Sequence, residues 1–250
     1  MKIQVAGVSF EVEPLYPTTE KYCEAFLTNE PAEHNIVLTP EDIAFERQKN
    51  IREAEVEGIP YVDFPDAYLE TIALQRKIAE LFFDYDRLLF HGSAIAVDGK
   101  AYLFTAKSGT GKSTHTRLWR ELLGERAVMV NDDKPFLSFE SGGVIVHGSP
   151  WNGKHRLGSN LSVPLSAICI LERGEENRIR ELAPSQALSM LIQQSSRPRD
   201  AAKLAKYMEL LDKLARCVKF YRLSCNMSLD AARVSYTEMS KENRKQEMIP

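Results

Sequence analysis

The residues best suited to chemistry lie in one glycine-rich segment near the middle of the chain. Residues 106–113 read A-K-S-G-T-G-K-S and match the pattern G-x-x-x-x-G-K-S/T, except that Ala106 replaces the first glycine. Small residues let the backbone approach an anion, and glycine adopts backbone angles that other residues avoid, so the N–H groups of such a loop converge on phosphate oxygens. The segment therefore predicts a nucleoside triphosphate site formed by Ser108, Gly109, Thr110, Gly111, Lys112, Ser113 and Thr114.

Two residues of this loop have individual expected roles. Lys112 is expected to reach the β- and γ-phosphates, and the Ser113 hydroxyl is expected to ligate Mg²⁺. The helix that should follow adds the positive end of its dipole, which favours an anion. ATP and Mg²⁺ are thus the expected ligands. The alternative is a glycine-rich turn that binds nothing, but this interpretation does not explain the lysine at position 112.

A pair of carboxylates provides the second signal. Asp132 and Asp133 follow the apolar run 127–130, where a nucleotide-binding sheet presents its acidic residues. Successive strand residues point to opposite sides, so Asp132 can enter the Mg²⁺ shell while Asp133 faces an acceptor hydroxyl. Two carboxylates this close can also keep one of them protonated. A solvated turn is the alternative interpretation.

Three further candidates are less specific. His91 precedes Gly92 at the end of an expected strand, where a histidine can equally be a satisfied core or surface group. Lys154 and Arg156 lie in the turn-rich segment 148–156, and their charges suit a transferring phosphoryl group. The alternative for these two cations is an ordinary surface loop.

The surrounding pattern predicts the elements that position these residues. Two apolar runs, 94–97 and 101–104, flank Asp98-Gly99-Lys100, a strong hairpin signal, and the second run leads directly into the glycine-rich loop. A helix over 114–123 and a strand over 127–130 follow. Further elements are expected at 74–82 (helix), 135–139, 144–146 and 167–171 (strands), 185–195 and 200–216 (helices), 220–223 (strand) and 229–239 (helix).

This order predicts an α/β fold with a mixed β-sheet core flanked by helices. Residues 63–250 are expected to form the phosphate-loop domain, and residues 1–62 a small N-terminal annex of strands and loops without a chemical motif, beginning with a hairpin over 1–12.

The composition limits the classes of partner. The 32 basic and 35 acidic residues give a net charge of −3 and are mixed along the chain, which argues against nucleic acid as a partner. The four cysteines form no C-x-x-C pair, as is typical of reduced thiols. The N-terminus lacks a signal peptide, and no run of eighteen apolar residues occurs, so a cytoplasmic protein without membrane contact is expected.

The order of motifs resembles a known group. A strand ending at His91-Gly92, a hairpin, the loop 108–113, a helix, a strand and Asp132-Asp133 are similar to the superfamily of HPr kinase/phosphatase and ATP-dependent phosphoenolpyruvate carboxykinase. The resemblance covers residues 87–175, and more loosely the chain to about residue 240. It implies that Asp132 lies near Mg²⁺, that Asp133 is the base toward a hydroxyl acceptor, and that His91 lies near the transferring phosphate or a second metal.

The departures from this group narrow the expected activity. Thr114 stands where HPr kinases carry an acidic residue, and residues 150–154 replace their signature loop, so neither HPr as the acceptor nor a phosphatase activity is supported. The chain also resembles HPr-kinase-like proteins of similar length, including kinases that modify ribosomally made peptides. The sequence predicts an ATP-dependent kinase acting on a hydroxyl of a protein, peptide or small molecule, in a chain whose relatives often form homo-oligomers. A regulatory nucleotide-binding module without turnover and carboxykinase-type chemistry on a small keto acid remain as alternatives.

Overall fold

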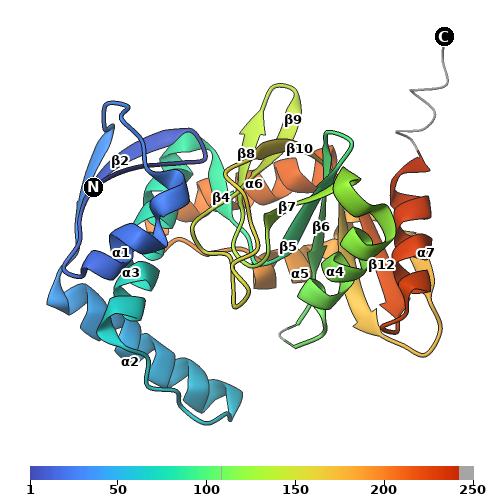
Figure 1. Cartoon of the computed structure of the whole chain (residues 1–250), viewed down its shortest axis with the longest axis horizontal. Coiled ribbons are helices and arrows are strands. Elements are labelled where there is room, and N and C mark those ends of the chain that lie inside the picture. The colour runs from blue at the N-terminus through green and yellow to red at the C-terminus, as the bar shows by residue number, and fades with distance from the viewer. Residues whose placement is uncertain (108, 242–250) are drawn as a thin grey trace. The chain divides into compact units, whose positions relative to one another are not determined.

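The structure is a computed structural model that describes residues 1–107 and 109–241 (Figure 1). The chain divides into two compact units, Met1–Phe82 and Phe83–Pro250. This boundary lies later than the expected one at residues 62/63. Helix α3 (Asp66–Phe82) belongs to the first unit because it packs against α1 (Pro17–Tyr22) and α2 (Pro40–Glu57).

The first unit contains a three-stranded sheet in the order β1-β2-β3. Strands β1 (Lys2–Val5) and β2 (Val8–Glu13) form the predicted antiparallel hairpin, and β3 (His34–Val37) pairs parallel with β2. The hairpin turn has positive φ at both Ala6 and Gly7, as a two-residue turn of this kind requires. A short 3₁₀ helix, η1 (Glu24–Phe26), follows α1.

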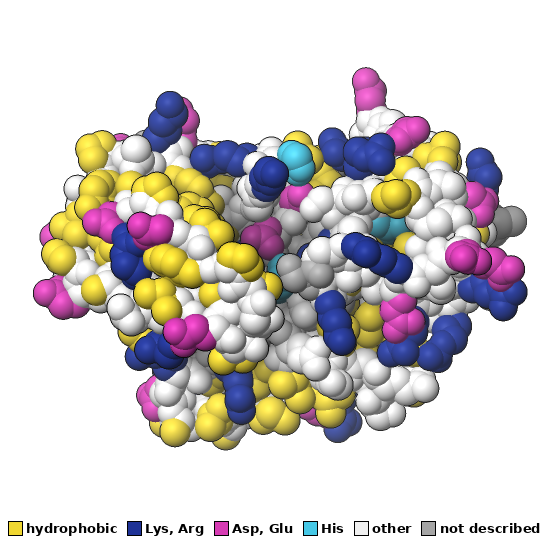
Figure 2. Space-filling view, turned by 90° about the horizontal axis from the view of Figure 1, so that it is seen from below, with side chains coloured by type: hydrophobic (Ala, Val, Ile, Leu, Met, Phe, Trp, Pro, Cys, Tyr) yellow, Lys and Arg dark blue, Asp and Glu magenta, His cyan; other side chains and the backbone are white. Residues whose placement is uncertain are grey.

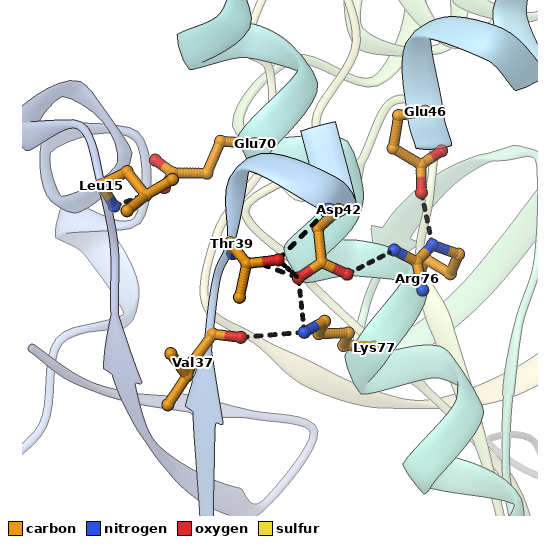
Figure 3. Close-up of polar contacts among 8 residues, drawn as sticks. All are labelled: Leu15, Val37, Thr39, Asp42, Glu46, Glu70, Arg76 and Lys77. Atoms are coloured by element: carbon orange, nitrogen blue, oxygen red, sulfur yellow. Dashed lines mark hydrogen bonds and ion pairs between the residues drawn. The ribbon is translucent and has the colours of Figure 1, made fainter. Parts of the chain in front are cut away.

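Helix α2 shows that the expectation of only strands and loops in this region is wrong. Its buried positions carry few apolar side chains, so its sequence gives no clear apolar stripe. The helix is instead fixed by polar contacts: Thr39 and Asp42 form a capping box at its start, and Arg76 of α3 pairs with Asp42 and Glu46 (Figure 3).

A buried carboxylate also anchors the start of this unit to α3. Glu70 has no exposed surface and accepts a hydrogen bond of 2.5 Å from the backbone N–H of Leu15 (Figure 3). The backbone N–H of Tyr16 is a second donor, at 3.3 Å. The Thr19 hydroxyl is a third donor. Because each of these donors would otherwise be unpaired, Glu70 and its partners stabilise the unit as a set.

The second unit is built on one mixed sheet, which runs β4-β8-β9-β10-β6-β5-β7 among the described residues, with β12 paired to both β10 and β11. Strand β10 is parallel to β6 and β12 and antiparallel to β9. The strands are β4 (Arg87–Leu89), β5 (Ser93–Val97), β6 (Lys100–Thr105), β7 (Ala127–Asn131), β8 (Phe136–Glu140), β9 (Gly143–His147), β10 (Ser162–Arg173), β11 (Arg178–Leu182) and β12 (Lys219–Cys225).

Helices cover both faces of this sheet (Figure 1). Ala94 and Leu103 join a core with α5 (Pro184–Gln194) and α6 (Leu204–Cys217), whereas their neighbours Ile95 and Tyr102 join a core with α4 (Lys112–Leu123) and α7 (Leu229–Met239). Burial on both faces explains why these strands read as continuous apolar runs. Short 3₁₀ helices, η2 (Phe83–Tyr85), η3 (Gly124–Arg126) and η4 (Ala201–Lys203), complete the unit.

Most expected elements of this unit are confirmed. The hairpin across Asp98-Gly99 joins β5 to β6, and both turn residues have positive φ. On the face seen in Figure 2, basic side chains are intermingled with acidic ones, in keeping with the mixed composition. Within the described ranges, no helix combines the length and apolar character needed to cross a membrane.

Candidate active site

The glycine-rich loop connects the end of β6 to the start of α4, as the sequence predicts. Gly109 and Gly111 have φ values of 74° and 116°, which other residues rarely adopt, and Gly111 directly precedes the helix. Ala106 is fully buried in the core shared with α4 and α7, so a methyl group is accommodated at the position of the missing glycine. Ser108 lies outside the described residues.

One hollow of about 350 Å³ gathers most of the predicted residues. Its lining brings Lys112 and Ser113 of the loop together with Asp132 and Asp133 at the end of β7. The remaining lining residues are His91, Gly109, Gly111, Thr114, Gly153, Lys154 and His155. Residues from four separate segments of the chain therefore share one cavity.

Two predicted residues lie elsewhere. Arg156 is an exposed residue of the segment after β9 and is not part of this lining, whereas the adjacent His155, which the sequence analysis did not select, is. Thr110 lines a second hollow, together with Gly109, Gly111 and Thr114.

Asp132 lies in a nearly closed polar environment. It is 5% exposed, and its Oδ1 accepts a hydrogen bond of 2.6 Å from Ser93 Oγ, which lies 3.0 Å from Thr116 Oγ1. Burial raises the pKa of Asp132, and hydrogen bonds from the Ser93 and Ser113 hydroxyls oppose this rise. The hydroxyl and carboxylate that the sequence assigns to Mg²⁺ are thus direct neighbours.

The Ser113–Asp132 pair suits Mg²⁺ chemically. Mg²⁺ prefers oxygen ligands and is usually held by one or two carboxylates together with substrate phosphates and water, rather than by a cage of protein groups. The described residues contain no cluster of three or more His, Cys, Asp or Glu side chains that could hold a metal ion alone. Among these residues, Ser113 and Asp132 thus offer one hydroxyl and one carboxylate side by side.

Asp133 differs from its neighbour in its electrostatics. Burial tends to raise the pKa of Asp133, but the hydrogen bond from His91 and the charges of Lys134 and Lys112 outweigh it, and the net pKa is lowered. His91 Nε2 lies 3.2 Å from Asp133 Oδ1. Burial lowers the pKa of His91, so at neutral pH the imidazole is neutral and donates from Nε2 to an ionised carboxylate.

Lys112 faces both carboxylates. Burial lowers the pKa of its ammonium group, and the negative charges of Asp133 and Asp132 oppose this. Charges in such a partly buried hollow interact more strongly than in bulk water, so Lys112 is attracted to both carboxylates.

Asn131 organises the turn that carries the two aspartates, and the sequence analysis missed it. This asparagine is fully buried, and its Oδ1 accepts from the backbone N–H groups of Asp133, at 2.8 Å, and Lys134, at 2.7 Å. Its Nδ2 donates to Asn152 Oδ1 at 2.8 Å and to Ser149 Oγ at 3.0 Å. One amide therefore connects the aspartate turn to the segment after β9.

The segment after β9 is held at a fixed distance from that turn. The backbone N–H of Lys134 donates to Trp151 O at 3.2 Å, and Ser149 Oγ donates to Lys134 O at 2.6 Å. Two glycines permit close approach: a Cβ at Gly148 would lie 1.9 Å from Ser159 O, and one at Gly158 would lie 2.0 Å from Asn152 Oδ1. The turn-rich segment 148–156 is thus held beside the two aspartates, and its residue Lys154 lines the hollow.

Asn131 carries a weak sequence signal. An asparagine immediately before a carboxylate pair, at the end of an apolar strand, can accept from backbone N–H groups two and three residues ahead, as Asx turns do. Its contacts with residues 149 and 152 depend on tertiary structure and have no local sequence pattern.

Comparisons with known proteins give one family. The family model of the SynChlorMet cassette protein ScmC matches residues 66–230, which is most of the chain and includes every residue of this hollow. None of the curated proteins compared with the chain matches it significantly. Among solved structures, the HPr(Ser) kinase/phosphatase from Coxiella burnetii is similar at 12% identity, with 64% of this chain and 98% of that chain covered and a TM-score of 0.39. The chain belongs to the family of the SynChlorMet cassette protein ScmC.

Proposed function

We propose that this protein is an ATP-dependent kinase that transfers the γ-phosphoryl group to a hydroxyl of a protein, peptide or small molecule. The observation that carries the proposal is the single hollow in which Lys112 and Ser113 meet Asp132 and Asp133. Phosphoryl transfer depends mainly on positioning and charge neutralisation, and these groups supply both.

The glycine-rich loop holds the phosphates in this proposal. Backbone N–H groups of residues 109–113 and the start of α4 surround the anion, and Lys112 lies beside its terminal phosphates. Ser113 and Asp132 would hold Mg²⁺, which would supply positive charge to the phosphate groups during transfer. Ser93 orients the Asp132 carboxylate through its hydrogen bond.

Asp133 acts as the base toward the acceptor. A bond forms between the acceptor oxygen and the γ-phosphorus while the bond from that phosphorus to the β,γ-bridging oxygen breaks, so that ADP leaves. The acceptor proton passes to Asp133, whose lowered pKa keeps it ionised and ready to accept. His91 holds one oxygen of that carboxylate in place. Lys154, at the edge of the hollow, adds positive charge where the phosphoryl group moves.

The replacement Asp133→Asn tests the proposal directly. It preserves shape but removes the proton acceptor, so we expect transfer of labelled phosphoryl from ATP to fall by about 10²–10⁴-fold, the usual contribution of a general base. MgATP affinity, measured by titration calorimetry, should change little. The matched control is Asp212→Asn, an exposed carboxylate of α6 that pairs with Arg216, which should leave both measurements unchanged.

The acceptor classes are separated in the same assay. Serine- and threonine-containing peptide mixtures and small polyols are offered in parallel, with MgATP labelled at the γ-position. Transfer that Asp133→Asn abolishes supports the kinase. Tight MgATP binding without transfer to either class would favour a regulatory module, and absence of MgATP binding would overturn both.

A further inference from the structure

A second hollow of about 520 Å³ borders the glycine-rich loop. Gly109, Gly111 and Thr114 line this hollow and also line the hollow of the aspartates. Its far walls come from the ends of β10 and β12 and the residues that follow them, including Leu171 and Met227. The loop is therefore a shared wall between two cavities.

The two cavities differ in chemistry. The hollow of the aspartates contains two carboxylates and two lysines, whereas the second hollow has buried Leu118 and Leu171 on its lining, each 4% exposed. Met227 also lines it and is 79% exposed, an unusual degree for an apolar side chain at the mouth of a cavity. Such a lining suits a flat, largely apolar group rather than a phosphate.

The polar groups of the second hollow are already engaged in holding its walls. His115 bonds to Ser235 Oγ at 2.9 Å, and burial lowers its pKa to about 4, so it is neutral and offers no charge to an anion. The guanidinium of Arg173 donates to Gly109 O at 2.6 Å. Arg173 thus connects the end of β10 to the loop, and its planar cation lies at the cavity wall.

We infer that the second hollow binds the base and ribose of the nucleotide whose phosphates occupy the glycine-rich loop; this rests on the function proposed above. Gly109, Gly111 and Thr114 line both hollows, so a nucleotide whose γ-phosphoryl group lies beside Asp133 can extend past these residues and place its other end in the apolar cavity. The volume of this cavity is within the range of small-molecule sites.

Individual side chains have distinct roles in this site. Met227 packs on the face of the base, where a thioether makes favourable contacts with an aromatic ring. Arg173 is a positioning residue for the loop, because its guanidinium donates to Gly109 O. Leu118 and Leu171 form the floor.

Cys225 provides a test in the unaltered protein. It lines the second hollow and is partly exposed, whereas Cys217 is exposed on α6, and Cys23 and Cys169 are buried. Burial raises the pKa of Cys225, so alkylation with iodoacetamide is followed at mildly alkaline pH, site by site, by mass spectrometry. At an ATP concentration about ten times its Kd, we expect Cys225 to react about tenfold more slowly. Inorganic tripolyphosphate, which lacks base and ribose, should leave its rate unchanged, and Cys217 should respond to neither.

A surface variant gives an independent measurement. Met227→Asp places a charge against the base without disturbing the buried core and should weaken ATP affinity by about tenfold, or 1.4 kcal/mol, while tripolyphosphate affinity is retained. Met208→Asp, at a 49% exposed position of α6, is the matched control and should change neither.

The outcomes separate this inference from the proposed function. ATP binding with equal reactivity of Cys225 in its presence and absence, or with unchanged affinity in Met227→Asp, overturns the base site and leaves the phosphate site standing. Failure of both ATP and tripolyphosphate to bind overturns the proposed function, and this inference with it. Protection of Cys225 by ATP but not by tripolyphosphate, together with weakened binding in Met227→Asp, supports the site.

Discussion

His91 Nε2 lies 3.2 Å from Asp133 Oδ1. His91 lies just after β4 and Asp133 lies in the turn after β7, so this contact joins two segments that are distant in sequence. The backbone strengthens the connection, because Gly92 N donates to Asp133 O at 2.9 Å. A neutral histidine and an ionised carboxylate are thereby held as one unit at the edge of the hollow.

Removal of the His91 donor should move the acid side of the activity profile to higher pH. The hydrogen bond from His91 lowers the pKa of Asp133 against the effect of burial, so His91→Phe raises that pKa and the protonated, inactive carboxyl persists at higher pH. The rate of phosphoryl transfer is measured against pH for both proteins. His91→Gln, which retains a donor, should restore part of the original profile; superimposable profiles for His91→Phe and the parent protein would contradict the assignment.

Loss of the Asn131 donor should lower turnover far more than nucleotide affinity. Asn131→Asp keeps the acceptor for Asp133 N and Lys134 N but sets a carboxylate against Asn152 Oδ1. We expect kcat to fall by about 100-fold through misplacement of Asp133. The free energy of unfolding should fall by about 1–3 kcal/mol. Steady-state kinetics and calorimetric MgATP affinity separate the two effects, and an equal loss in affinity and turnover would show that Asn131 serves only the fold.

Gly148→Ala should destabilise the second unit. The added Cβ would lie 1.9 Å from the carbonyl oxygen of Ser159, a backbone atom that cannot rotate away. We expect a loss of roughly 1–3 kcal/mol, typical of overpacking. The control is Gly142→Ala, where the added Cβ meets no atom within 4 Å. Thermal unfolding of both variants, monitored by circular dichroism, should give a clearly lower Tm only for Gly148→Ala.

Stability should decline as the pH falls from about 6.5 toward 4. Burial lowers the pKa of His147, which bonds to Ser162 and Ser138, and that of His115, in each case to about 4. In the unfolded chain both imidazoles take up a proton below about pH 6.5, so in this window the unfolded state binds more protons and acidification favours it.

The magnitude of this effect is testable at His147. Each pH unit of the window costs about 1.4 kcal/mol per histidine. Urea unfolding at a series of pH values should give a shallower decline for His147→Asn than for the parent protein, although the variant is less stable at neutral pH. An unchanged slope would show that His147 does not remain neutral in the folded state.

Local sequence patterns predicted the second unit better than the first. Strands β5 and β6 are almost wholly buried, and β7 is buried except at Val128, so their apolar runs and the turn Asp98-Gly99 were visible without knowledge of the fold. Helix α2 was missed because Arg76, distant in sequence, neutralises its buried Glu46. The capping box at Thr39 and Asp42 was the available local signal for this helix.

The candidate site also combines residues that local sequence motifs predict with residues that only tertiary contacts reveal. Two motifs of fixed spacing predicted four of the site residues, and the fold places all four around one hollow: Lys112, Ser113, Asp132 and Asp133. Asn131 acts through residues 149 and 152, so only tertiary structure reveals its part. Sequence patterns offered no reason to prefer Lys154 to Arg156 as a site residue. In the structure, the backbone has positive φ at Gly153 and Arg156, and Lys154 lines the hollow whereas Arg156 does not.

Strand β10 limits how this protein can be divided or recombined. Its first residues pair with β9, and its later ones lie between β6, which leads to the glycine-rich loop, and β12, which leads to Met227. A fragment ending before residue 162 would lack β10, which lies in the middle of the sheet. A chimera in which residues 148–158 are replaced must connect the new segment to the original β10. Short grafts around Lys154 would leave the pairing of β10 intact, whereas exchange of one half of the unit for another would separate β10 from strands with which it pairs.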